Sequence, residues 1–543
     1  MRVLSMIMLM TLLGASTVLP GQSRQEDWNL CKSHDPEQSI RGCSALIQSS
    51  HDTGINLAKA FTNRGSGYAT KGDYNRAIQD YDQALRLNPK SSEAFSGRGS
   101  AYAYKGDDDH SIQDYDQALR LNPSLPNAFY GRGWAYAHKG DYVHAIQDYD
   151  QALRLKPSLA DALRERGIAY TRENDYDHAF QDYDQALRLN SNDAIAFFDR
   201  GLAFAHKGDY DRAIQDYDQA LQLNPKFADA FYGRGVSYAR KRGYDRAIQD
   251  FNQALRLNPS FANAIYSRGV AYADKGDYDR ATADYDQAVR LNPNDADPFY
   301  SRGVAYKHKG DFDRAIADYD QAVRLNPSFA NAFYGRANAY AHKGNYDHAI
   351  QNYDQALRLD PNLADAFCGR GLAYADKGDY DRAIADYDQA WRLNPNLANA
   401  VYNRGLAYLH TGNYDRAIAD YDQALRLTPN DADAFDGRGL AYANKGDDDR
   451  AIRDYDQAIR LNAKQVNAFR NRSQAYARKG DYVRAMADRG HFLWLKFGPS
   501  GITILLCLLA FVVAVAFRLS FKRFRKGPVT GQEPYTGIFH SRN

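Results

Sequence analysis

Proline recurs at a fixed interval of 34 residues, and this spacing constrains the fold more than any other feature of the chain. Ten prolines keep the register: Pro89, Pro123, Pro157, Pro225, Pro259, Pro293, Pro327, Pro361, Pro395 and Pro429. An arginine followed by a small residue keeps the same interval from Arg64-Gly65 to Arg472-Ser473, which makes thirteen copies. Periods of this size indicate supersecondary units that stack because no unit can bury its own faces alone.

One copy predicts two helices joined by a tight turn. Ala60–Lys71 has apolar residues at helical spacing, and Lys71-Gly72-Asp73 supplies a glycine C-cap and an aspartate N-cap. Tyr74–Leu87 is then a second helix, which Asn88-Pro89 ends. Its buried stripe is predicted to hold Ala77, Ile78, Tyr81, Ala84 and Leu85. No strand pattern accompanies the repeat, so we expect an all-α fold.

These positions resemble the tetratricopeptide repeat family. The residues that carry the resemblance are Phe61, Arg64-Gly65, Tyr68, Ala77, Tyr81 and Pro89, repeated in register. The resemblance implies a right-handed superhelical solenoid of about thirteen helix-turn-helix repeats, with the first helices lining a concave groove that receives an extended or helical peptide. The departure is Arg64, where the family often has leucine.

The recurrent charges have a structural interpretation. We expect helical pairs Asp82–Arg86 and Arg76–Asp80, and we expect Arg64 to meet carboxylates of the Asp80 or Asp82 type. Two turns depart from the pattern, because Asn174 replaces the turn glycine and Lys241-Arg242-Gly243 shifts that glycine by one position.

Both ends of the chain differ from the repeats. Residues 1–23 read as a signal peptide, with one basic residue before an apolar run, and residues 498–519 as a transmembrane helix. A buried soluble helix is the alternative for the second segment. Basic residues follow it, so the positive-inside rule makes residues 520–543 a cytoplasmic tail. Between them, 24–57 is predicted to be an N-terminal cap and 58–497 the repeat array.

The cap contains a candidate disulfide. Pro36–Gln48 resembles a degenerate second helix, and Cys31 and Cys43 could join two helices there. Export would allow this oxidation, which would contribute roughly 3 kcal/mol for so short a loop. Two free buried thiols are the alternative.

Candidate binding residues are those that vary between copies and leave the core. Aromatic side chains recur on the first helices beside an apolar floor, which suits peptide capture because tyrosine combines contact area with a hydrogen-bonding tip. The candidate groove residues are Tyr130, Trp134, Phe198, Tyr232, Tyr266, Tyr300, Tyr334 and Tyr402. The alternative is that these rings only pack against neighbouring helices.

Other classes of function find little support. The net charge of +2 argues against a nucleic-acid partner. Histidines at one repeated position (His138, His206, His308, His342 and His410) are a whole repeat or more apart, which does not fit a metal site and favours a solvated edge. We find no phosphate loop, nucleophile motif or room for a catalytic domain, and expect no enzyme activity, cofactor or metal.

The sequence therefore predicts a membrane-anchored scaffold that binds a protein or peptide partner. We expect a single-pass protein of a bacterial inner membrane, with the array periplasmic and the tail cytoplasmic. Two alternatives stay open: a structural solenoid that self-associates as a spacer, and a cytosolic tail-anchored adaptor whose first residues are not a signal.

Overall fold

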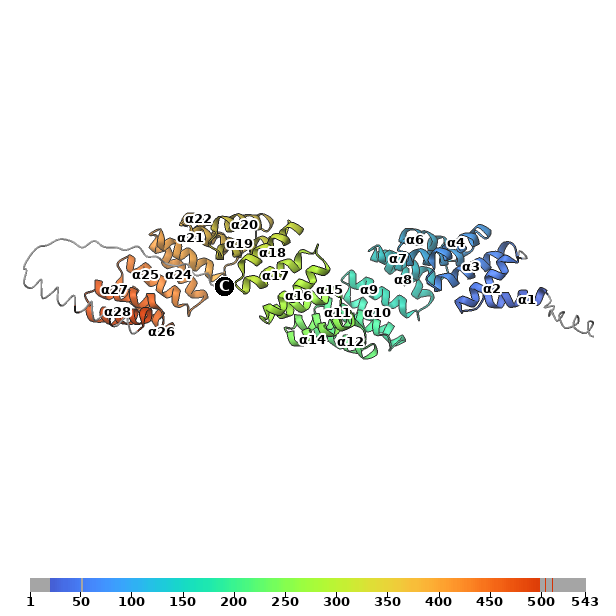
Figure 1. The fold of residues 1–543 in the computed structure, drawn as a ribbon, viewed down its shortest axis with the longest axis horizontal. Helices are drawn as coiled ribbons and strands as arrows, with labels where there is room; N and C mark the ends of the chain where they lie inside the picture. The colour runs from blue at the N-terminus through green and yellow to red at the C-terminus, as the bar shows by residue number, and fades with distance from the viewer. Residues whose placement is uncertain (1–19, 50–51, 499–502, 504–509, 511–543) are drawn as a thin grey trace, which may run out of the picture. The chain divides into compact units, whose positions relative to one another are not determined.

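The computed structural model describes residues 20–49, 52–498, 503 and 510, and the regular secondary structure of these residues is α-helical throughout. The chain divides into two compact units, Met1–Ala271 and Tyr272–Asn543, and α15 (Ala262–Asp274) crosses the boundary between them. Figure 1 labels the helices of both units.

The helices alternate between the first and second helix of a repeat. In the first unit they are α1 (Pro20–Cys31), α2 (Pro36–Gln48), α3 (Gly54–Thr70), α4 (Tyr74–Leu87), α5 (Ser92–Tyr104), α6 (Asp108–Leu121), α7 (Pro126–His138), α8 (Tyr142–Leu155), α9 (Ala160–Arg172), α10 (Tyr176–Leu189), α11 (Ala194–Lys207), α12 (Tyr210–Leu223), α13 (Ala228–Arg240) and α14 (Tyr244–Leu257).

The second unit continues the same alternation. Its helices are α16 (Tyr278–Leu291), α17 (Ala296–His308), α18 (Phe312–Leu325), α19 (Ala330–His342), α20 (Tyr346–Leu359), α21 (Ala364–Asp376), α22 (Tyr380–Leu393), α23 (Ala398–His410), α24 (Tyr414–Leu427), α25 (Ala432–Asn444), α26 (Asp448–Leu461), α27 (Val466–Arg478) and α28 (Tyr482–Phe497).

Within each unit a helix packs against the next one along the chain, and first helices of neighbouring repeats also touch, as α3 touches α5. The predicted all-helical solenoid is therefore confirmed for the described residues. The second helix predicted at Tyr74–Leu87 is α4 itself, whereas the first helix begins at Gly54, before the predicted start at Ala60.

An aromatic residue, tyrosine in all but one case, joins the helices from α4 to α26 at one position of each second helix; in α14 it is Phe251. Tyr81 of α4 is 3% exposed, and its ring lies against Gly65 of α3 and Gly97 of α5. A Cβ added at Gly97 would stand 2.6 Å from the Tyr81 ring, so only glycine lets the next helix come this close. Alanines such as Ala77 and Ala84 are completely buried beside it. The small residues of the repeat therefore set the helix spacing, and tyrosine fills the joint.

The turns show why the repeat needs Gly-Asp. Gly72 has a φ of +78°, a left-handed conformation that favours glycine, and Asp73 then accepts a hydrogen bond of 3.1 Å from the backbone N–H of Arg76. Arg242 has a φ of +60°, so it occupies the left-handed position itself. The glycine shifted by one position, Gly243, is the N-cap of α14 and provides no side-chain bond.

The N-terminal cap is a helix pair, α1 and α2. Asp35 accepts a hydrogen bond of 2.8 Å from Gln38 N–H at the start of α2. Cys31 and Cys43 form a disulfide with an S–S distance of 2.05 Å, and Leu46 is buried beside both. The helix α2 has the bounds predicted for it.

Two predicted segments fall mainly outside the described residues. The signal peptide is described only at residues 20–23, which open α1, and the transmembrane segment only at 498, 503 and 510. Among the helices that the structure does describe, none combines the length and the apolar character needed to cross a bilayer.

Candidate peptide-binding site

The predicted aromatic residues all lie on first helices and are half-buried. They come from seven helices: Tyr130 and Trp134 from α7, Phe198 from α11, Tyr232 from α13, Tyr266 from α15, Tyr300 from α17, Tyr334 from α19 and Tyr402 from α23. The apolar residues one turn further on, such as Val236 and Val304, are half-buried as well. Each unit thus carries its own row of aromatic and aliphatic side chains.

These rings also pack against the interior. The Tyr232 ring lies 5.9 Å from Phe251, the second-helix aromatic of its own repeat, and 5.0 Å from Phe261 at the entrance to the next repeat. Tyr300 repeats the arrangement with Tyr319 at 5.9 Å and Phe329 at 4.9 Å. The packing role considered for these residues therefore has direct geometric support, and a binding role would use only the part of each ring that solvent reaches.

In two other copies, the position that holds Tyr130 and Tyr402 is occupied by a residue that is not aromatic. Cys368 of α21 packs against the cluster around Tyr387, and burial raises the pKa of its thiol to about 12, which disfavours the thiolate form. Asp436 of α25 is 8% exposed and accepts a hydrogen bond of 3.1 Å from Asn471 of α27. Burial raises the pKa of Asp436 to about 7.

A charged cluster interrupts the row in the first unit. Arg164 of α9 takes the position that holds Tyr130 one repeat earlier, and it pairs with Glu165 at 2.7 Å and Asp199 of α11 at 2.9 Å. Sequence reasoning missed this cluster. The available signal was that Glu165 and Asp199 stand where the neighbouring copies have Gly131 and Gly233.

The histidines at the exposed edge stack on the preceding repeat. The His308 ring lies 4.9 Å from Tyr278 with an interplanar angle of 2°, and His342 lies on Phe312 in the same way. Where aspartate replaces the stacking ring, a basic residue meets it: Arg478 pairs with Asp448 at 2.6 Å. Burial lowers the pKa of His308. The histidine residues are nevertheless exposed, as predicted for a solvated edge. Their stacking on the preceding repeat also contributes to the repeat joints.

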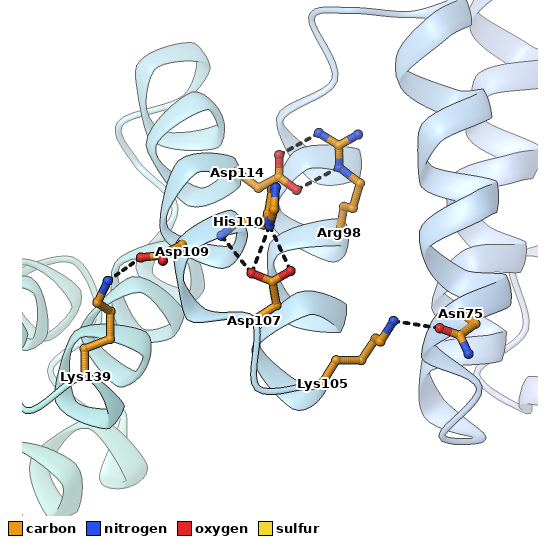
Figure 2. A network of polar contacts seen from close by, with 8 residues as sticks. All are labelled: Asn75, Arg98, Lys105, Asp107, Asp109, His110, Asp114 and Lys139. Carbon is orange, nitrogen blue, oxygen red and sulfur yellow. Dashed lines mark hydrogen bonds and ion pairs between the residues drawn. The ribbon is translucent and has the colours of Figure 1, made fainter.

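Repeated arginines hold the second helices in place. Arg98 of α5 donates two hydrogen bonds of 2.7 Å to Asp114 of its own repeat, drawn in Figure 2, and one of 2.6 Å to Asp82 of the preceding repeat. Eleven further first helices carry an equivalent arginine with this inter-repeat contact or its asparagine counterpart: Arg132, Arg166, Arg200, Arg234, Arg268, Arg302, Arg336, Arg370, Arg404, Arg438 and Arg472. The predicted pairing of arginine with both carboxylate types is confirmed.

The predicted pairs within one helix do not form in the first copy. Asp80 binds Arg64 of α3 at 2.7 Å, and Arg76 binds its N-cap residue Asp73 at 2.5 Å. Asp82 binds Arg98 instead of Arg86. A second row of contacts joins a turn lysine to the preceding repeat, and Figure 2 shows two of them, Lys105 with Asn75 and Lys139 with Asp109. The arginine contacts and the lysine contacts both join one repeat to the one before it, so both have a structural role in the stacking of repeats.

In the described part of the chain, no three histidine, cysteine or acidic side chains are grouped in a way that could hold a metal ion. The candidate surface consists of rows of half-buried rings and aliphatic side chains on first helices, with the arginine–aspartate contacts of the repeat joints behind them. The fold and this surface define a helical-repeat protein of the scaffold type.

Family models make the assignment specific. A "TPR repeat" model matches residues 99–140, 169–208, 203–241, 243–276, 271–310, 305–344, 337–378 and 439–480. Two "Tetratricopeptide repeat" models match residues 368–432 and residues 58–91 and 126–159. The chain belongs to the tetratricopeptide repeat family.

Solved structures share the repeat fold at low identity. The APC/C hetero-tetramer Cut9-Hcn1 is 17% identical, with 92% of this chain and 98% of that chain covered and a TM-score of 0.39. YrrB, described as a TPR protein with an unusual peptide-binding site, is 28% identical over 34% of this chain and 95% of that chain, with a TM-score of 0.31. Yeast Tom70 is 19% identical over 78% and 96%, with a TM-score of 0.35. No curated protein sequence gave a significant match.

Proposed function

We propose that this protein is a membrane-anchored scaffold that binds a protein or peptide partner on the surface of its first helices. The observation that carries the proposal is the row of half-buried aromatic side chains, at positions that differ between copies, in each unit. A partly exposed tyrosine offers a large apolar area and a hydrogen-bonding hydroxyl at low entropic cost, which suits the capture of a peptide.

The anchoring part of the proposal comes from the sequence. Residues 502–517 contain no charged residue, and Arg518, Lys522 and Arg523 follow directly. Such a run is long enough to span a bilayer together with residues 498–501, and its basic flank favours a cytoplasmic tail. With residues 1–23 as a signal peptide, the array would lie on the exported side of a bacterial inner membrane. N-terminal sequencing tests this: an intact Met1 in the mature protein would overturn export.

Affinity capture tests the binding surface, with the full chain in detergent as bait. Because the rings also pack inside, replacing them with leucine keeps apolar volume against their neighbours while removing the aromatic face and hydroxyl. One variant changes Tyr130, Phe198 and Tyr232 to leucine, and a second changes Tyr300, Tyr334 and Tyr402. The two variants test the two units separately.

The matched control changes three exposed apolar residues of second helices, Leu223, Leu257 and Leu291, to serine. All variants must first show the helicity and melting temperature of the parent chain. A partner that the leucine variants lose and the control retains supports the proposal. A partner that all variants retain equally places binding elsewhere, and recovery of the bait alone favours the self-associating spacer.

A further inference from the structure

The last helix of the repeat array, α28, has an apolar face that is exposed. Its large apolar side chains that solvent reaches are Tyr482, Val483, Met486, Trp494 and Phe497, which are between 41% and 82% exposed. At about 100° of rotation per residue, these five positions fall within roughly a third of the helix circumference. They form one surface, which we call the end face. The outer face of a terminal repeat is usually polar, because it has to be soluble without a neighbour.

In earlier repeats the next first helix covers the same face. The ring of Tyr74 in α4 stacks on that of Tyr104 in α5 at 5.4 Å, and Ile78 packs against the buried cluster that α4 shares with α5. Tyr482 and Met486 hold these two positions in α28. Among the described helices, no first helix follows α28. The end face is therefore a joint surface without a partner helix.

The sequence of α28 does not suit a further repeat as that partner. Arg489 stands where Tyr81 of α4 reaches the glycine of the next helix, and Gly490 stands where Asp82 binds the next arginine. Both contacts that join one repeat to the next would be missing. A first helix of a second chain would lack the same two contacts, so the end face fits a partner of another kind.

Positive charge borders the end face. Arg489 and Lys496 lie beside it and are exposed. The one acidic residue of α28, Asp488, is buried and bound to Arg472 at 2.6 Å, so it does not offset their charge. The ammonium group of Lys496 lies 5.4 Å from the centre of the Phe497 ring. An apolar face with a basic border complements a surface of anionic phospholipid headgroups over hydrocarbon.

The length of the following chain keeps this face near the membrane. Four residues, 498–501, separate α28 from the charge-free run at 502–517. Even fully extended, four residues reach only about 14 Å. With the run across the bilayer, as proposed above, the C-terminal end of α28 is held at the membrane surface. Trp494 and Phe497 lie at that end, and aromatic side chains favour the membrane interface.

We propose that α28 lies on an anionic phospholipid bilayer with its end face in contact with lipid. The proposal rests on the membrane anchoring proposed above and adds a second contact, which would fix the orientation of the last repeats at the membrane. An amphipathic helix of this kind lies in the plane of the interface, with its basic residues at the headgroups. A tether alone would leave Val483, at the far end of a helix roughly 24 Å long, in water.

The test places a spin label at Val483 in the full chain, reconstituted in vesicles of phosphatidylcholine and phosphatidylglycerol. Cys368→Ala and Cys507→Ala remove the other thiols, while Cys31 and Cys43 stay in their disulfide. Val483→Cys then carries a nitroxide. Electron paramagnetic resonance measures how well oxygen, which partitions into lipid, and a water-soluble nickel complex reach the label. The ratio of oxygen to nickel accessibility reports on contact with lipid.

The matched control is Val143→Cys in the same background. Val143 holds the equivalent position in α8 and is likewise exposed. The ratio is expected to be several-fold higher at Val483 than at Val143. Arg489→Gln with Lys496→Gln, added to the Val483 chain, is expected to lower the ratio, as is the omission of phosphatidylglycerol. All variants must first show the helicity and melting temperature of the parent chain.

Equal ratios at Val483 and Val143 would overturn the proposal. A chain that then still floats with the vesicles after a carbonate wash keeps its anchor, so only the lipid contact of α28 is wrong. A chain that the wash releases has no membrane span, and both proposals fail. Dipolar broadening between Val483 labels that disappears on dilution with unlabelled chain would show that a second copy covers the end face, which also overturns the lipid contact.

Discussion

Arg98 Nη1 and Asp82 Oδ1 lie 2.6 Å apart, and this contact joins two successive repeats. The same guanidinium holds Asp114 of its own repeat through its other nitrogens. One side chain thus fixes a first helix to two second helices. In an array stabilised by contacts between neighbouring repeats, such a contact acts on both the unit and its interface.

The two carboxylates that bind Arg98 are predicted to differ in importance. The Asp114 side chain is 7% exposed and that of Asp82 is 41% exposed. Asp114→Asn should therefore lower the free energy of unfolding by about 3 kcal/mol, since it removes the buried charge partner of a shielded guanidinium and leaves only the more exposed Asp82. Asp82→Asn should cost less than about 1 kcal/mol, as for other exposed pairs. Urea unfolding with hydrogen exchange across α4–α6 measures both, and equal losses would contradict the assignment of Asp114 as the main partner.

The close approach of glycine and tyrosine gives a second prediction. A Cβ at Gly131 would lie 2.3 Å from the Tyr115 ring, so Gly131→Ala must displace a buried aromatic side chain. We expect a loss of about 1–3 kcal/mol despite the higher helix propensity of alanine.

The control for this substitution is Gly405→Ala. There the nearest atoms are 3.3–3.4 Å from the added Cβ, so small adjustments can accommodate it. Thermal unfolding followed by circular dichroism should show a lower melting temperature for Gly131→Ala than for Gly405→Ala. If Gly131→Ala is as stable as its control, the joints are looser than the structure indicates.

The periodic part of the fold was predictable because each copy repeats the same helix spacing, turn residues and capping residues. The helix at Tyr74–Leu87, its aspartate cap and the tyrosine core follow from spacing and turn chemistry. Features that depend on contact between copies were not predictable. Asp80 and Asp82 have arginines at helical spacing in the sequence, yet Arg64 and Arg98 from other helices bind them. The sequence does not show that an arginine of another helix lies closer to each aspartate than the arginine four residues away in the same helix.

The candidate site shows the same division. The sequence located the aromatic row, but it could not show that Tyr232 packs 5.9 Å from Phe251. Nor could it show that Glu165 and Asp199, one repeat apart, share a single arginine. Both facts depend on how far one repeat is displaced from the next.

Asp436 gives a prediction about pH. Burial raises the pKa of this carboxyl to about 7, so the folded state favours the protonated form more than the unfolded state does. Its stabilising contribution is complete below the unfolded pKa near 4 and is lost as pH rises through about 7. The loss is on the order of 4 kcal/mol if the carboxyl stays buried.

The variant Asp436→Asn removes this titration and keeps an oxygen that Asn471 can donate to. Hydrogen exchange across α25–α28 should show that the parent chain loses protection between pH 5 and pH 8, and that the variant loses less. Other buried aspartates titrate in both proteins, so only the difference between them reports on Asp436. The same pH dependence in both would show that the Asp436 carboxyl is not the group responsible.

The turn before α14 can be stabilised by copying the other repeats. Arg242 has a φ of +60°, which costs a residue with a Cβ roughly 1–2 kcal/mol relative to glycine, and Gly243 leaves α14 without a side-chain cap. In the preceding repeat, Asp209 caps α12 by accepting from Arg212 N–H at 3.2 Å. Arg242→Gly with Gly243→Asp should therefore raise the free energy of unfolding by about 1–2 kcal/mol.

Asn174 provides the comparison for that double substitution. It has a similar φ of +62°, but asparagine tolerates the left-handed conformation better than arginine. Moreover, Asp175 already caps the following helix by accepting from His178 N–H. Asn174→Gly should then gain only a few tenths of a kcal/mol. Urea unfolding, with hydrogen exchange across α13–α14 and α9–α10, measures both gains, and an equal gain at the two turns would show that backbone conformation and capping are not what separates them.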